Sequence, residues 1–156
     1  EYLCSLGHSR FGYIGCHGER YENYAAVMDK YGLADSDYVF DGMGYPENGI
    51  KGMQFFLRME KPPTAIFCHN DSVALSAMAE AQRNGLEIGS DISIIGIDNT
   101  LESGFSYPAL TTIDTFIGQK AGIMVDLLLE RFGTPEKKAV SLTLKSKLIM
   151  IGRAHV

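Results

Sequence analysis

The sequence predicts an α/β fold in which a parallel sheet carries helices on both faces. Short apolar runs alternate with longer amphipathic segments along the chain, which indicates strands that alternate with helices. The clearest strand is the run ISIIGI at residues 92–97, and the clearest helix is the Ala-rich segment 71–84. Strand–helix–strand units connect in a right-handed sense, so we expect three layers, with the sheet between two layers of helices.

The first half of the chain contains three predicted strands and three predicted helices. The helices cover residues 1–7, 22–31 and 47–59. The strands cover residues 11–16, 37–40 and 65–68. Gly7 and Gly32 follow the first two helices where a C′ glycine is typical, and the pair Pro62-Pro63 breaks the third.

The second half is predicted to continue the alternation and to finish in strands. Its helices cover residues 71–84 and 116–132. Its strands cover residues 92–97 and 110–113, with a loop of about ten residues between them. Gly133 and Pro135 close the last helix. Residues 139–144 and 147–151 are expected to form a strand or a hairpin.

The composition bounds what this segment does by itself. The chain has 156 residues, enough for one domain or slightly more, and a net charge of −5 without any run of Lys or Arg. Phosphate contact needs clustered basic residues, so this segment is not expected to bind DNA. Three separated cysteines argue against a disulfide framework and for a reducing, cytoplasmic environment. No apolar stretch is long enough to span a membrane.

Polar side chains follow several of the predicted strands. In an open parallel sheet, ligands bind beyond the carboxyl ends of the strands, so these residues are the candidates for a site. Arg20, Asn70 and Asp98 together offer a planar donor, an amide and a carboxylate, which suits a polyhydroxylated ligand. Asn70 and Asp71 also precede a helix, where such residues commonly act as N-caps, and Asp98-Asn99 also fits an ordinary turn. The two interpretations are compatible.

Other kinds of site have weaker support. Cys16-His17 and Cys68-His69 follow different strands and offer a possible metal site, but no close ligand pair accompanies them. No Gly-x-Ser-x-Gly elbow is present, and the glycines at 12, 15 and 18 do not match a dinucleotide fingerprint. We therefore expect no catalytic residue, no metal and no cofactor.

Four segments, taken in order, resemble the lac repressor/galactose repressor (LacI/GalR) family of bacterial transcription regulators. They are LGHSRFGYIG (6–15), PTAIFCHNDSVALSAMAEAQRNGL (63–86), DISIIGIDNT (91–100) and YPALTTID (107–114). The resemblance implies a two-lobed effector domain of the type I periplasmic-binding-protein-like fold. Residues 1–113 would form the C-terminal lobe, residues 114–138 a crossover helix to the N-terminal lobe, and residues 139–156 a returning strand segment. The helix-turn-helix and most of the first lobe would lie outside this chain.

The resemblance also assigns roles to residues. Arg20 matches the family's effector-binding arginine, Asn70 its cleft asparagine and Asp98 its cleft aspartate. Tyr45 lies near the position of a stacking aromatic, although Gly44 is closer in register. The loop at residues 16–20 is shorter than is usual in the family, so the effector's identity is left open. A sugar is favoured, with a purine or a sugar phosphate as alternatives.

The function implied by the resemblance is that of a sensor and not of an enzyme. A small molecule would bind between the lobes of a homodimer that contacts operator DNA through a separate N-terminal domain. The dimer would form along the helix after Asn70-Asp71 and the loop at residues 103–107. The alternatives are a periplasmic sugar-binding protein of a transport system and, with less support, an enzyme built on a doubly wound sheet.

Overall fold

A six-stranded sheet forms the centre of the computed structural model, which describes residues 1–134, 136 and 138–150. The strands are β1 (Phe11–Gly15), β2 (Val39–Asp41), β3 (Ala65–Cys68), β4 (Ser93–Ile97), β5 (Thr111–Asp114) and β6 (Lys147–Ile149). Their order is β2-β1-β3-β4-β5-β6, with every neighbouring pair parallel except the antiparallel pair β5–β6. The predicted α/β class with a parallel sheet is confirmed.

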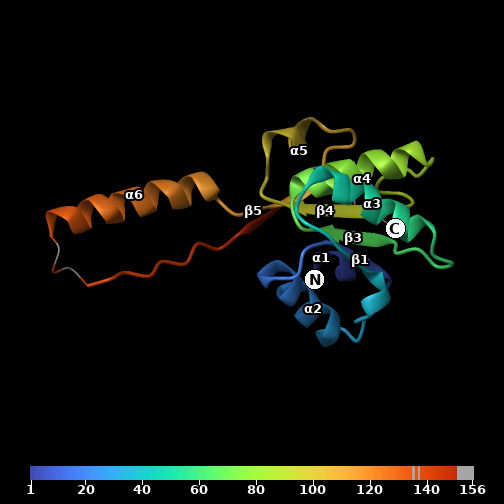
Figure 1. Cartoon of the computed structure of the whole chain (residues 1–156), viewed down its shortest axis with the longest axis horizontal. Coiled ribbons are helices and arrows are strands. Elements are labelled where there is room, and N and C mark those ends of the chain that lie inside the picture. Colours follow the sequence, from blue (N-terminus) through green and yellow to red (C-terminus); the bar gives the residue numbers. More distant parts are fainter. Residues whose placement is uncertain (135, 137, 151–156) are drawn as a thin grey trace.

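Helices cover the parallel part of the sheet on both faces (Figure 1). Helices α3 (Pro46–Leu57) and α4 (Asp71–Arg83) pack on one face, where Met53, Phe56 and Val73 are fully buried. Helices α1 (Tyr2–Ser5) and α2 (Glu19–Lys30) lie on the other face, in a second cluster with Phe11, Ala65 and Ile95. Every residue of β1 and β4 is buried, because central parallel strands contact helices on both sides.

Several element boundaries differ from the prediction for local reasons. Residues 37–38, predicted as strand, belong to the short 3-10 helix η1 (Ser36–Tyr38), because the Asp35 side chain accepts a hydrogen bond from the Asp37 amide and forms a turn. The loop predicted after β4 contains the short helix α5 (Leu101–Phe105). Residues 139–144, predicted to form a strand or a hairpin with residues 147–151, adopt no regular structure, since no strand of the sheet pairs with them.

The C-terminal part of the chain forms an arm that projects from the lobe (Figure 1). Helix α6 (Ile117–Gly133) leads outward, and residues 138–146 return to β6. No residue of α6 is buried. Pro135 and residues 151–156, which include the predicted end of the last strand, lie outside the described residues.

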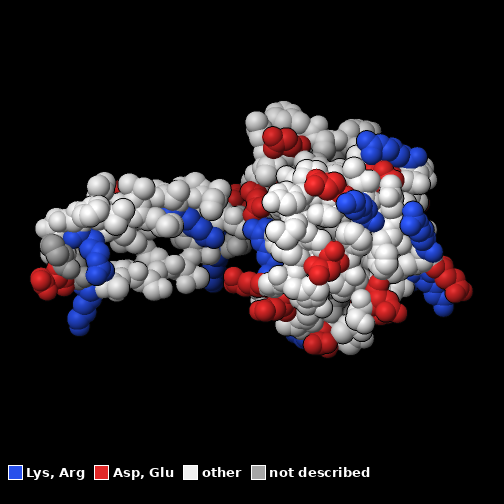
Figure 2. All heavy atoms as spheres, viewed as in Figure 1, with Lys and Arg blue, Asp and Glu red and all other residues white. Residues whose placement is uncertain are grey.

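The visible surface of the lobe carries interspersed acidic and basic side chains (Figure 2). The arm in the same view shows long uncharged stretches along α6. Among the described residues, no helix combines the length and the apolar character needed to cross a membrane.

A buried histidine links three segments at the amino ends of the central strands. His8 is 6% exposed. Its Nδ1 lies 2.9 Å from Thr64 Oγ1, and its Nε2 lies 3.0 Å from Ser93 Oγ. Burial lowers the pKa of His8 below that of an exposed histidine. The unfolded chain therefore binds a proton at this residue more readily than the folded chain does.

We predict that His8 makes the fold sensitive to mild acid. The folded pKa is depressed, so the stability that His8 contributes is present above its unfolded pKa and is lost as the pH falls through the folded pKa. Thermal unfolding between about pH 7 and pH 5 should show a steeper loss of Tm for the unchanged protein than for His8→Gln. His69 is present in both proteins, so its titration cancels in the comparison. Parallel Tm profiles would contradict this role of His8.

Candidate functional site

Arg20 and Asp98 meet at the rim formed by the carboxyl ends of β1, β3 and β4. Arg20 lies in the first turn of α2, directly after the short loop that leaves β1, and Asp98 directly follows β4. Arg20 Nη2 donates to Asp98 Oδ1 at 2.8 Å, and Arg20 Nη1 donates to the carbonyl oxygen of His69 at 2.5 Å. Both charged side chains are 34% exposed, so they are held in place and still open to solvent. The expected convergence of these two residues is present.

Asn70 lies at the same rim, but its side chain is used within the protein. Its Oδ1 accepts a hydrogen bond from the Val73 amide at 2.9 Å, which makes Asn70 the N-cap of α4. Its Nδ2 donates to the carbonyl oxygen of Gly44 at 2.9 Å and ties the loop before α3 to the rim. The capping interpretation therefore describes Asn70 itself, and a contact with a ligand stays a prediction.

Tyr45 stands beside the rim, and its neighbour Gly44 faces it. Tyr45 is the N-cap residue of α3 and is 57% exposed. A Cβ placed on Gly44 would lie 2.9 Å from Asn70 Nδ2 and 2.9 Å from His69 Cδ2. A side chain at this position would therefore displace Asn70 or His69, so the close approach of the loop to the rim favours glycine. Tyr45 is the only aromatic residue of the loop at residues 42–45, and a contact between its exposed ring and a ligand stays a prediction.

His69, considered from the sequence only as part of a possible metal site, is a member of the rim. Its Nδ1 lies 3.4 Å from Tyr13 Oη, and both ring nitrogens lie within 3.9 Å of Cys16 Sγ. Burial lowers the pKa of His69, and the nearby Arg20 lowers it further. The imidazole is therefore neutral at neutral pH, and its backbone carbonyl holds Arg20. The signal for this residue was its position directly after β3.

The metal alternative finds no complete ligand set in the part of the chain that the structure describes. Cys68 is fully buried, and burial raises the pKa of its thiol, while His17 pairs with Asp41 at 3.3 Å. No group of three His, Cys, Asp or Glu residues suitable for a metal ion occurs among these residues. The pair Cys16–His69 has separations of 3.8 and 3.9 Å, longer than the usual reach between a nucleophile and its base.

Comparisons with known proteins agree with this architecture. The profile of the periplasmic binding protein-like domain matches residues 1–150. The HTH-type transcriptional repressor PurR of Actinobacillus pleuropneumoniae serotype 3 is 38% identical over 138 residues, which cover 84% of this chain and 41% of that protein. The HTH-type transcriptional repressor CytR of Escherichia coli K12 is 41% identical over 121 residues, which cover 72% of this chain and 35% of that protein.

A solved structure of another transcriptional regulator has the same fold. The LacI transcriptional regulator from a Rhodococcus species superposes with a TM-score of 0.89 at 30% identity, over 99% of this chain and 59% of that chain. The segment that matches PurR and CytR covers less than half the length of each of these curated repressors.

We predict that Asn70 stabilises the fold through its cap. Asn70→Ala removes the acceptor for the Val73 amide and should lower the free energy of unfolding by about 1 kcal/mol. Asn70→Ser keeps an acceptor at the N-cap, so it should recover most of that loss although it gives up the bond to Gly44. Urea unfolding of the three proteins measures the difference. Equal stability of the Ala variant and the unchanged protein would show that the cap is not needed.

Proposed function

This chain belongs to the periplasmic binding protein-like domain family, and from that premise we propose that it is the C-terminal lobe of the effector domain of a bacterial transcription regulator. The identity to two transcriptional repressors, 38% and 41%, supports a regulator over a transport component or an enzyme. The observation that carries the proposal is the Arg20–Asp98 pair at the rim, where fold and side-chain chemistry both point to a ligand.

The chemistry of this pair favours a neutral ligand with neighbouring donors and acceptors. Arg20 and Asp98 bind each other at 2.8 Å, so together they present one positive and one negative group. A ligand with adjacent hydroxyl groups replaces both halves of this interaction, since the guanidinium donates to one oxygen and the carboxylate accepts from another. A phosphate would face the Asp98 carboxylate at close range. We therefore favour a sugar over a sugar phosphate, with the edge of a purine as the alternative.

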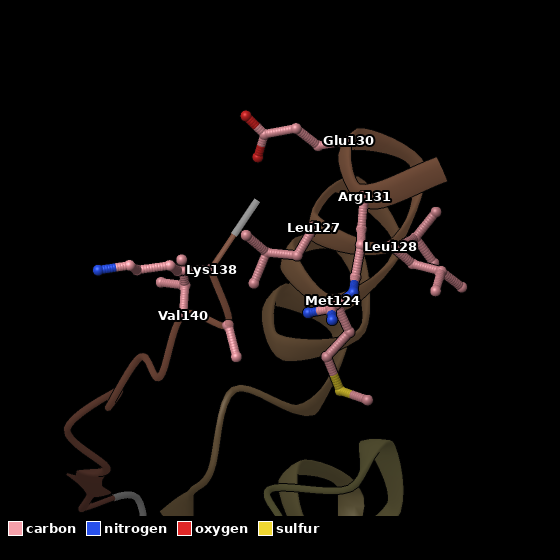
Figure 3. A pocket seen from close by; sticks show the side chains of 9 residues that line it. Met124, Leu127, Leu128, Glu130, Arg131, Lys138 and Val140 are labelled. Carbon is pink, nitrogen blue, oxygen red and sulfur yellow. The ribbon is translucent and has the colours of Figure 1, made fainter. Parts of the chain in front are cut away.

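The exposed arm supports the proposal that an N-terminal lobe packs against this chain. Helix α6 has no buried residue, and several of its large apolar side chains, including Met124, Leu128 and Phe132, are exposed. A groove of about 480 Å³ lies between α6 and residues 138–140, lined by Met124, Leu127 and Val140 (Figure 3). An amphipathic helix obtains most of its stability from packing, so we propose that residues 114–138 cross to an N-terminal lobe and that residues 139–156 return from it.

A second exposed surface supports homodimerisation. Leu101 is 76%, Phe105 80% and Tyr107 90% exposed, and they border a groove of about 460 Å³ that α4 completes. The carbonyl oxygen of Tyr107 accepts a hydrogen bond from Gln82 on α4 at 2.8 Å, which fixes this loop. Exposed apolar clusters of this kind mark protein interfaces. We propose that this surface pairs two copies, and that operator DNA is contacted by a separate domain because the net charge of this chain is −5.

We predict that Asp98 and Arg20 govern the affinity for the effector in the intact regulator. A thermal-shift screen with neutral sugars, nucleobases and sugar phosphates identifies the ligand, since one that binds only the folded protein raises the Tm. Asp98→Ala should then weaken binding about tenfold or more, because a charge-assisted hydrogen bond is lost. Arg20→Lys should recover little of the affinity lost in Arg20→Ala, since a point charge does not replace a planar fork.

The matched control for these variants is Glu60→Ala, which removes an exposed carboxylate on the loop after α3. It should leave effector affinity unchanged. Unchanged affinity in Asp98→Ala, measured by titration calorimetry with the same ligand, would refute the site.

We also predict that Phe105 contributes to the dimer. Phe105→Glu places a charge on the surface formed by α4 and α5, so the intact regulator should shift toward monomer in analytical ultracentrifugation. Tyr31→Glu changes an exposed aromatic residue at the end of α2 and serves as the control, which should sediment like the unchanged protein. The same dimer fraction in both variants would assign the interface to another surface.

A further inference from the structure

The turn that presents Asp98 has an unfavourable backbone conformation. Asp98 has a φ of 108° and Asn99 a φ of 51°, and neither residue is glycine. Non-glycine residues with positive φ cost free energy and persist where the surrounding structure fixes them. The carboxylate of Asp98 reaches Arg20 from this conformation. The groups that fix the turn therefore determine where the carboxylate lies.

A buried carboxylate and a buried hydroxyl hold this turn. Asp71 Oδ2 accepts a hydrogen bond from the Thr100 amide at 2.8 Å, and Asp71 Oδ1 accepts one from the Thr112 hydroxyl at 2.5 Å. Thr112 Oγ1 in turn accepts from the Asn99 amide at 3.3 Å. Both Asp71 and Thr112 are fully buried. Two successive amides of the turn are thus bonded to one network that has no contact with solvent.

The strand beside this network leaves space for the carboxylate. A Cβ placed on Gly96 of β4 would overlap Asp71 Oδ1, so this strand position admits only glycine while Asp71 keeps its place. Burial raises the pKa of Asp71, and the hydrogen bonds from Thr112 and Thr100 act in the opposite direction. A buried carboxyl group needs both oxygens satisfied, and here the turn and β5 supply the donors.

We propose that Asp71 and Thr112 are positioning residues for the effector site, which act by holding the turn of residues 98–100 so that the Asp98 carboxylate faces Arg20. The proposal rests on the role of Asp98 given under Proposed function. Neither residue contacts the ligand. Asp71 begins α4 and Thr112 lies in β5, so the network also fixes the rim against two elements of the core.

Thr112→Val tests the proposal in the intact regulator, because valine keeps the shape and removes the hydroxyl. Amide hydrogen–deuterium exchange at residues 98–100 should become faster, and binding of a fixed panel of neutral hexoses and disaccharides should weaken about tenfold. Thr112→Ser retains the hydroxyl and should restore both values. Ser76→Ala, which removes a hydroxyl bonded to the backbone of its own helix, is the control for hydroxyl loss in general.

The outcomes separate this proposal from the site assignment. Unchanged exchange at residues 98–100 in Thr112→Val overturns the proposal, and so does unchanged sugar binding where Asp98→Ala abolishes it. Loss of sugar binding in Thr112→Ser as well as Thr112→Val also overturns it, because the hydroxyl would then not be the cause. If Asp98→Ala leaves binding intact, the assignment of Asp98 fails, and the exchange measurement alone still decides whether the network holds the turn.

Discussion

The carboxylate of Asp71, fully buried beneath the rim, is the constraint on which the geometry of this lobe depends. A charged group is tolerated in a core only when its lone pairs are satisfied, and the donors here come from the turn after β4 and from β5. Gly96 gives the carboxylate space within β4. The start of α4, two strands and the turn that carries Asp98 are therefore fixed relative to one another by a single side chain.

The meeting of Arg20 and Asp98 was predictable from the sequence, because the carboxyl ends of parallel strands share one edge of the sheet. The partners of each side chain were not. Asn70 donates to the carbonyl of Gly44, which is 26 residues away in the chain, and no local pattern encodes that pairing. The partners of Asp71 were likewise not predictable. The sequence suggested only an N-cap role for this residue, whereas its buried carboxylate accepts a hydrogen bond from Thr112. Local sequence preferences identify the candidate residues, but tertiary contacts determine the partner of each side chain.

The prediction from sequence is wrong where tertiary contacts, and not local periodicity, determine the secondary structure. Helix α5 is too short to show a helical repeat and contains Gly104, a poor helix former. It forms where the Thr100 amide is held by Asp71 and where the Ser103 carbonyl accepts from the Leu110 amide. Residues 139–144 show the reverse case, since an apolar, strand-like composition does not produce a strand without a neighbour to pair with.

One uncovered apolar surface of the lobe borders the proposed cleft. A groove of about 490 Å³ between α1, α2 and the sheet is lined by Phe67, Ile95 and Ile113, and Arg20 and Leu148 of the returning strand border it as well. Surfaces of this kind are stable in water when another part of the protein covers them. An N-terminal lobe that covered this groove would contact Arg20, which is paired with Asp98. Under the proposed function, Arg20 would then contact both the ligand and the N-terminal lobe. A change in the packing between the lobes would therefore alter ligand binding, and ligand binding would alter the packing.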